Sequence, residues 1–445
     1  MKNIKTVLIF GMLTLVLAGS AWAEKVPGTV ENSTNSTANG KEELADFNTC
    51  ARIALRQSPV LSKTSLEIEV RRLDEKDSRS DLFPTFVFRT AYYPVKPNAD
   101  EDPLNYSLQW ISESYNPMVA YLTMKVKQLI TRAATYIHQK AISEGLQKLA
   151  QGFLELDTLT KLAVLQKEAI VLAQKSLAYS QKQLKSGETT PLEVQIAAQE
   201  LELAQADEER LASEQARVRQ TMQAFMGLKP GQDLTFDLKQ TPEQVLGSFD
   251  ANAANWEQTK AHSVDLKVQN LKKELQSWNV SLAKMKLMPG FFVGVQTPDP
   301  LNTQNVRGVY FSMGLTWTIP ILGGDKRWRD ITRQKTILQQ AGAEVETTGI
   351  ELQNRWQAGK EKLRQAATAL KKAQSQEELA RLKLRQSEIL YQAGDEPYNV
   401  LLDRQKKYLS AKMNTLQKIT DYNLEKLALR HLSGDLLYRY VDERF

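Results

Sequence analysis

The chain has 445 residues, 25% of them charged, and its formal net charge is +6 at pH 7. The 58 basic residues are almost balanced by 52 acidic ones, so the composition gives little support for a nucleic acid partner, and we expect none. The single cysteine, Cys50, excludes an intrachain disulfide. Packing must therefore stabilise the fold.

The N-terminus has the pattern of a secretory signal peptide over residues 1–23. Lysines precede an apolar run that is too short to span a bilayer as a helix, and Ala21-Trp22-Ala23 resembles a cleavage site. Residues 24–45 are rich in Ser, Thr, Asn and Gly, which predicts a flexible periplasmic leader. No later stretch approaches the roughly 20 apolar residues of a spanning helix. We therefore expect an exported protein without a transmembrane helix.

The first half of the mature chain is predicted to be mainly helical. Residues 46–81 form a leading helix that is broken or bent near Ser58-Pro59. Residues 118–186 contain no proline, and their apolar positions step by four and three, which predicts a coiled-coil seam. The seam residues are Ile142, Leu146, Leu149, Phe153 and Leu156.

A chain reversal is predicted at Gly187, which reads as a helix C-cap followed by a proline at the start of a return helix over 191–225. At 1.5 Å per residue the outgoing helix would extend roughly 100 Å and the return helix about half as far. The leading helix should therefore cover the remaining half of the long helix.

Four short stretches alternate apolar and polar residues, which is the period of a β-strand. A strand of this kind fits a soluble core or a lipid bilayer, but the helix-rich chain offers no second sheet to cover four of them. Four strands cannot close a barrel, and open edges in lipid are costly, so the chain should oligomerise. The predicted lipid-facing residues are Phe86, Phe88, Leu108, Trp110, Phe291, Val293, Leu315 and Trp317.

Equivalent landmarks recur at a constant separation, which indicates an internal duplication. The separation is 207 residues for Gly187 and Gly394 (394 minus 187), for Gly227 and Gly434, and for Trp110 and Trp317, and it is 205 for Pro84 and Pro289. We therefore predict a first repeat over 46–227, an irregular insert over 228–261, a second repeat over 262–436 and a C-terminal tail over 437–445.

These features together resemble the outer membrane efflux protein (TolC) family over residues 46–436. The resemblance is carried by the segment from Thr318 to Asp325, by the turns at Gly187 and Gly394, and by the duplication. It implies a mainly α fold with a small β part, and a homotrimer whose twelve strands form one barrel continued by a periplasmic α-helical barrel. The sequence differs from the family at residues 114–117, where Ser-Tyr-Asn-Pro replaces a glycine pair.

The resemblance also implies a function, namely a passive exit duct in the outer membrane of a tripartite efflux or type I secretion system. A periplasmic adaptor would contact the turns at Gly187 and Gly394, and an inner-membrane transporter would deliver the cargo. Asp403 matches an aspartate that lines the periplasmic constriction, while Val400 replaces a second one. Alternatively, Asp403 pairs with a lysine or arginine on an adjacent helix, and Arg404 and Lys407 are also nearby in the sequence.

Other classes of protein fit the sequence less well. The histidines lie far apart without metal-ligand spacing, and there is no phosphate loop or nucleophile elbow, so we predict neither an enzyme nor a cofactor. A periplasmic coiled-coil adaptor or structural protein of an export complex is the main alternative, although an adaptor would not need four lipid-facing strands. A porin-like pore without a pump partner is a third. The sequence does not indicate the cargo.

Overall fold

A computed structural model describes residues 45–93, 105–112, 115–229, 234–238, 255–297, 310–316 and 325–436, all within the unit Leu44–Phe445. The predicted signal peptide, the leader up to residue 44 and the predicted tail lie outside the described residues. So do Trp317 and the motif from Thr318 up to residue 324.

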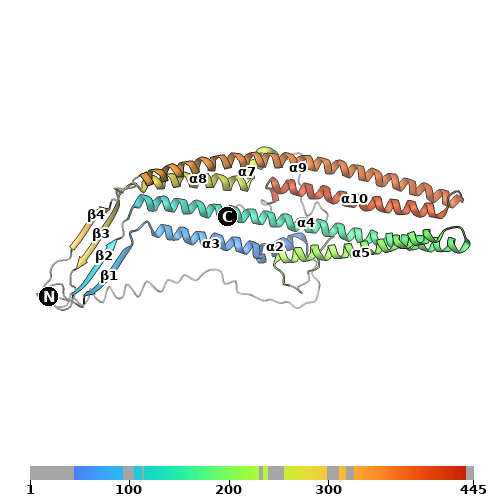
Figure 1. Ribbon diagram of the computed structural model, residues 1–445, viewed down its shortest axis with the longest axis horizontal. Coiled ribbons are helices and arrows are strands. Elements are labelled where there is room, and N and C mark those ends of the chain that lie inside the picture. The colour runs from blue at the N-terminus through green and yellow to red at the C-terminus, as the bar shows by residue number, and fades with distance from the viewer. Residues whose placement is uncertain are drawn as a thin grey trace. The chain divides into compact units, whose positions relative to one another are not determined.

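Each half of the chain contains the same order of elements (Figure 1). The first half has α2 (Phe47–Gln57), α3 (Pro59–Ser80), β1 (Phe86–Tyr93), β2 (Asn105–Ser112), α4 (Pro117–Ser186) and α5 (Pro191–Met226). The second half has α7 (Trp256–His262), α8 (Val264–Met285), β3 (Gly290–Thr297), β4 (Tyr310–Thr316), α9 (Asp325–Ala393) and α10 (Tyr398–Leu432). The predicted long helices, return helices and strands are thus confirmed.

Prolines and caps explain where the first helices begin. The leading helix is broken at Ser58, as predicted, because Pro59 lacks the N–H that would continue α2 and instead starts α3. The side chain of Asn116 accepts hydrogen bonds from the backbone N–H of Met118 and of Val119, at 3.1 and 3.2 Å. Asn116 and Pro117 therefore start α4 without the glycine pair that the family has there.

Four glycines end the long and the return helices in the left-handed region. Their φ angles are 78° at Gly187, 77° at Gly227, 84° at Gly394 and 79° at Gly434, and no other type of residue has a positive φ in the described part of the chain. Left-handed backbone is costly for residues with a Cβ. The landmarks of the duplication are therefore the positions at which the chain needs glycine.

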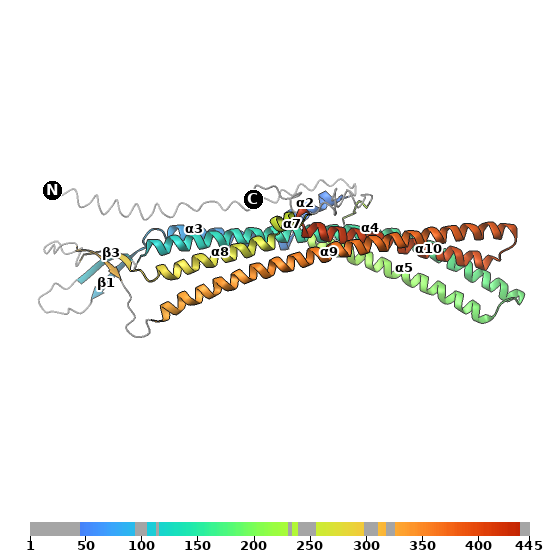
Figure 2. The same ribbon diagram turned by 90° about the horizontal axis from the view of Figure 1, so that it is seen from above.

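The helices form a layer in which α4 is central. It packs against α3 and α5, which follow one another along its length, and also against α8 and α10. The helix α9 packs against α7, α8 and α10. The predicted pairing of one long helix with two shorter ones is confirmed for both repeats (Figures 1 and 2).

The main hydrophobic core surrounds the middle of α4, where α2 packs against it. All five residues of the predicted seam are buried there. The ring of Phe153 meets the rings of Phe47 and Phe236 edge-on, each at 5.6 Å between centroids. Phe236 belongs to the insert and its backbone bridges Ala45. The core thus joins the start of the first repeat to the insert that follows it.

The strands form one antiparallel sheet in the order β1-β2-β3-β4. The central pair, β2 and β3, comes from different repeats, so the sheet joins the two halves of the chain. In the described sheet β1 and β4 each have a neighbour on one side only.

Candidate functional site

The strand register places the predicted lipid-facing residues on one face of the sheet. Residues directly opposite each other in neighbouring strands share a face. The pairs Phe88–Trp110, Trp110–Val295 and Val295–Phe311 connect all four strands in one row. By the alternation along each strand, Phe86, Phe88, Leu108, Trp110, Phe291, Val293 and Leu315 lie on that same face.

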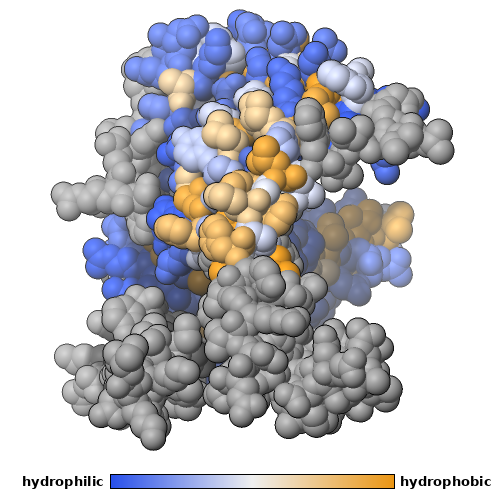
Figure 3. All heavy atoms as spheres, turned by 90° about the vertical axis from the view of Figure 1, so that its left-hand side faces the viewer, coloured by the Kyte–Doolittle hydropathy of each residue, from blue (hydrophilic) through white to orange (hydrophobic). Residues whose placement is uncertain are grey.

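This apolar face is exposed in the single chain. The exposed fraction is 53% for Phe88, 64% for Phe311, 63% for Met313 and 69% for Leu315. Figure 3 looks at the end of the molecule where the strands lie, and shows apolar side chains gathered in the centre of that end. The opposite face, called the polar face below, carries Ser312, Gly314 and Thr316 together with the apolar residues Val87, Ile111 and Phe292. Contact of the apolar face with lipid stays a prediction.

The two predicted adaptor-facing turns have the same geometry. At the first turn, Gly187 donates its N–H to the carbonyl of Leu184 at 3.2 Å, and Glu188 donates to Gln183 at 2.9 Å. Gly394 and Asp395 donate to Tyr391 and Leu390 in the same way. A Cβ at either glycine would meet no atom within 4 Å, so the backbone conformation alone requires glycine there. Each glycine is therefore a helix cap; contact with an adaptor stays a prediction.

Near these turns, side chains connect the two repeats. The Lys406 amine on α10 donates to the Glu200 carboxylate on α5 at 2.5 Å and to the Ser176 hydroxyl on α4 at 3.1 Å. The ring of Tyr398 contacts Tyr179 and Tyr391, with centroids 5.3 and 5.5 Å apart. The contacts of Lys406 with Glu200 and Ser176 and of Tyr398 with Tyr179 could not be predicted from the sequence, because nothing in the local pattern pairs residues about 200 positions apart.

Asp403 is paired within its own helix. Its carboxylate accepts a hydrogen bond from the amine of Lys407 at 2.6 Å, and its side chain is 49% exposed. The alternative drawn from the sequence placed the cation on an adjacent helix, whereas the structure places it on α10 itself. A role in a constriction stays a prediction, and any such role starts from a carboxylate whose charge is partly neutralised by Lys407.

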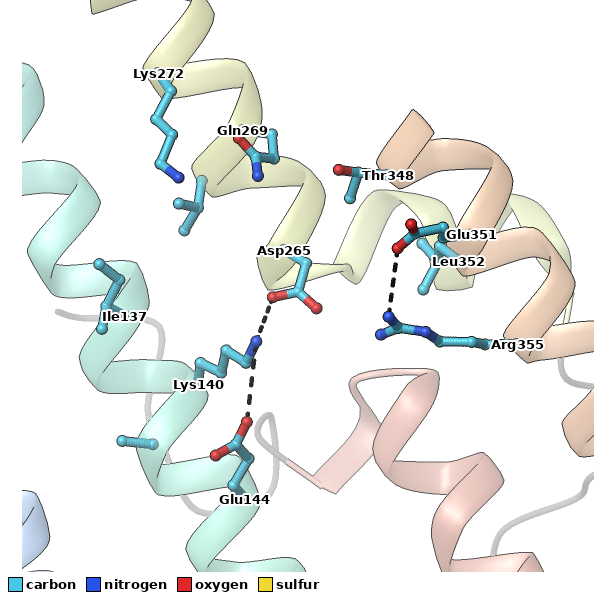
Figure 4. A pocket seen from close by; sticks show the side chains of 12 residues that line it. Ile137, Lys140, Glu144, Asp265, Gln269, Lys272, Thr348, Glu351, Leu352 and Arg355 are labelled. Atoms are coloured by element: carbon cyan, nitrogen blue, oxygen red, sulfur yellow. Dashed lines mark hydrogen bonds and ion pairs between the residues drawn. The ribbon is translucent and has the colours of Figure 1, made fainter. Parts of the chain in front are cut away.

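A cavity of about 620 Å³ lies between α4, α8 and α9. Figure 4 shows the amine of Lys140 between the carboxylates of Asp265 and Glu144, at 2.7 and 3.9 Å, and Arg355 beside Glu351, at 3.4 Å. These ion pairs satisfy most of the charges that line the cavity and connect α4 to α8. The cavity is therefore best described as a polar junction between helices.

The one cysteine of the chain, Cys50, is buried in the described part of the structure. Burial raises the pKa of the Cys50 thiol to about 12, with a smaller contribution from Asp46, so the thiol is protonated at neutral pH. No group of His, Cys, Asp and Glu in the described ranges could hold a metal ion. Among the described helices, none combines the length and the apolar character that crossing a bilayer requires.

No family model and no curated protein matches the sequence. The fold, in contrast, is similar to several solved structures. The outer-membrane channel OprN is 16% identical with a TM-score of 0.73, and the match covers 87% of this chain and 89% of that one. CusC, whose structures concern folding and transmembrane channel formation, is 15% identical with a TM-score of 0.75, and the match covers 90% of this chain and 95% of that one. The CmeC outer membrane channel of Campylobacter jejuni is 13% identical with a TM-score of 0.73 over 87% and 85%.

The fold is therefore that of the outer-membrane channels to which this chain is similar. The resemblance that the sequence carries is confirmed at the level of the fold, and it extends over nearly all of the described residues.

Proposed function

We propose that the chain is one subunit of an outer-membrane channel through which an efflux system releases its substrate. The observation that carries this proposal is the exposed apolar face of the sheet, which is continuous with a layer of very long helices. A single chain that exposes such a face needs a partner or a lipid environment. The efflux channels that share the fold support the lipid environment.

The edges of the helical layer support a ring of identical subunits. Exposed apolar residues lie along α3 and α5 on one edge and along α9 on the other. They are Leu66, Val70 and Leu73 on α3, Leu192, Ile196 and Leu203 on α5, and Ile350, Leu379, Leu382 and Ile389 on α9. Two different edges that cover each other give a heterologous contact, which forms a closed ring when the rotation between copies divides a full turn. Three copies give a twelve-stranded barrel, and we propose this homotrimer.

The remaining roles follow from this assembly. The polar face of the sheet lines a water-filled lumen, and the helices continue the duct into the periplasm. An adaptor contacts the turns at Gly187 and Gly394, and an inner-membrane transporter, either of a tripartite pump or of a type I secretion system, supplies the energy. Conduction through this chain is then passive.

Two adjacent positions on β4 test the orientation of the barrel. Leu315→Arg places a charge on the apolar face and should destabilise the assembled barrel by about 2–4 kcal/mol near the bilayer midplane. Thr316→Arg places it on the polar face and should assemble normally. The measurement is the yield of heat-resistant trimer in outer-membrane extracts. Equal yields from the two variants would contradict the orientation, and extraction of the wild-type protein without detergent would favour the periplasmic adaptor.

The adaptor contact is tested by photo-crosslinkers at Ser186 and at Ala393, which flank the two glycines. The matched control is Glu168, an exposed residue farther along α4. We expect the adaptor to be captured in cells from both turn positions and not from the control. Capture from residue 168 alone would place the adaptor on the side of the helical layer.

The constriction is tested by a pair of variants with opposite expected effects. Asp403→Ala removes the carboxylate and should enlarge the single-channel conductance and weaken block by trivalent cations added on the periplasmic side. Lys407→Ala frees the same carboxylate and should strengthen that block, since convergent carboxylates attract cations. If neither variant changes conductance or block in an assembled channel, Asp403 has no part in a constriction.

A further inference from the structure

The four strands contain a single charged residue. Within β1, β2, β3 and β4 only Arg89 carries a charge, and none of these strands contains Asp, Glu or Lys. In a barrel formed by several copies of the chain, the strands of each copy therefore contribute one positive charge and no negative charge.

The register places Arg89 on the polar face of the sheet. Arg89 is opposite Gln109, Gln109 is opposite Gln296, and Gln296 is opposite Tyr310. This row crosses all four strands beside the row that begins at Phe88, and successive residues of a strand point to opposite faces. Position 89 thus belongs to the face with Ser312 and Thr316, and its three row neighbours are uncharged.

We propose that Arg89 shifts the selectivity of the transmembrane part of the duct towards anions, independently of the charges at its periplasmic end. The inference rests on the proposed channel, in which the polar face lines the lumen. One arginine from each copy then forms a ring of like charges at a single level of the barrel, with uncharged residues around it.

The size of the barrel sets the strength of the effect. Twelve strands about 4.8 Å apart and tilted by about 40° give a backbone radius of roughly 12 Å. The Debye length is about 10 Å at 0.1 M salt and about 3 Å at 1 M. Three charges at this radius should change the chloride-to-potassium permeability ratio roughly two- to threefold at 0.1 M, and hardly at all at 1 M.

The experiment is the reversal potential of single channels in planar bilayers under a KCl gradient centred on 0.1 M. Arg89→Gln should lower the chloride-to-potassium ratio roughly two- to threefold, while Arg89→Lys should keep the wild-type ratio. The double variant Arg89→Gln with Gln109→Arg moves the charge to the paired position in β2 and should restore the ratio. The difference should disappear when the gradient is centred on 1 M.

The control for folding is the conductance at 1 M KCl, which should be equal in all four proteins. Equal reversal potentials for wild type and Arg89→Gln at 0.1 M would overturn the inference, and so would a double variant that fails to restore the ratio. A wild-type protein that forms no channels at all would instead contradict the proposed function. The double variant changes only residues 89 and 109 and leaves the segments between the strands unchanged. A difference in permeability ratio between it and Arg89→Gln therefore comes from this row of the sheet alone.

Discussion

The two long helices, α4 and α9, are copies of one element, yet they occupy different environments. They have 70 and 69 residues and end at equivalent left-handed glycines. α4 has helices on both sides, whereas α9 has its neighbours α7, α8 and α10 on one side of the layer. Both helices expose large apolar residues, such as Val164 on α4 and Leu379 on α9, but buried residues recur along much of α4 and are fewer on α9.

The seam of α4 shows how the copies diverged. Each seam residue of α4 has a counterpart 207 positions later on α9. The counterparts of Ile142, Leu146, Leu149, Phe153 and Leu156 are, in this order, Gly349, Gln353, Trp356, Lys360 and Leu363. Of these five pairs, only Leu156 and Leu363 have the same residue type, and both are buried. At the level of the main core, α9 instead has Lys360 over the ring of Trp356 at 4.8 Å. The two helices thus share their length and their terminal turns, while their side chains suit α4 to the inside of the layer and α9 to its edge.

The largest expected effect comes from truncating the side chain at two equivalent positions, one on α4 and one on α9. Phe153→Ala removes a ring that contacts Phe47 and Phe236 and should destabilise the subunit by about 3–5 kcal/mol. Lys360→Ala, 207 residues later, removes only an exposed cation–ring contact and should cost about 0.5–1 kcal/mol. Denaturant unfolding of the two purified variants measures the difference. Comparable losses would mean that α9 is as enclosed as α4.

The edge position of α9 predicts a smaller effect that is confined to assembly. Leu379→Asp places a charge on an exposed site and should leave the subunit folded while it weakens each contact between copies by about 2 kcal/mol or more. The equivalent Leu172→Asp lies on α4 beside a cavity shared with α5 and α10, and should destabilise the subunit itself. Sedimentation in detergent with circular dichroism separates the two outcomes. Trimers of normal stability from Leu379→Asp would place the contact elsewhere.

The return helices allow a sharper comparison at their terminal glycines. Gly227→Ala and Gly434→Ala should each cost about 1–2 kcal/mol from the left-handed backbone. A Cβ at Gly227 would also lie 2.4 Å from the carbonyl oxygen of Gln57, whereas at Gly434 its nearest atom is a side-chain carbon of His262 at 3.0 Å. The first variant should therefore have the lower Tm. Equal Tm values would show that the chain around Gln57 moves without cost.

The smallest effect concerns a histidine that joins the second repeat to α4. His431 Nδ1 lies 3.0 Å from the hydroxyl of Ser143. Burial lowers the pKa of His431; Lys140 lowers it further, and the carboxylates of Glu144 and Asp265 oppose this. The unfolded chain therefore binds this proton first as the pH falls, so stability is full above about pH 6.5 and decreases below it. Denaturant unfolding of His431→Gln between pH 7.5 and 5 should show a smaller decrease. An unchanged pH dependence would assign the effect to other groups.

Local chemistry made most of the fold predictable. The helix starts at Pro59 and Pro191 and the helix ends at the turn glycines depend on the backbone of those residues alone. The seam of α4 depends only on the helical period. Both can therefore be deduced from the spacing of residues in the sequence. The alternation of the strands likewise fixed the face of Leu315, and the duplication linked the two halves. The bounds of the helices then differ from the predictions by only a few residues.

Features that depend on contacts between distant residues were not predictable in the same way. The bond from Lys406 to Glu200 joins exposed polar residues that no periodicity distinguishes from their neighbours. An ion pair of Asp403 could be proposed, but the sequence suggested a cation on an adjacent helix, whereas the partner is Lys407 on the same helix. The strand order β1-β2-β3-β4 also required the structure, since alternation gives the face of a residue and not its neighbour in the next strand.

The pairing of β2 with β3 has a consequence for the joint between separate molecules. It connects the last strand of one repeat to the first strand of the next, and in a closed ring β4 would meet β1 of another copy in the same relation. Leu108 pairs with Thr297 inside the chain. Moving each residue to its counterpart, by 207 forward and by 205 back, places Leu315 opposite Tyr92 of the adjacent copy. For the proposed trimer, the pairing of β2 with β3 inside the chain therefore predicts how β4 and β1 align between copies.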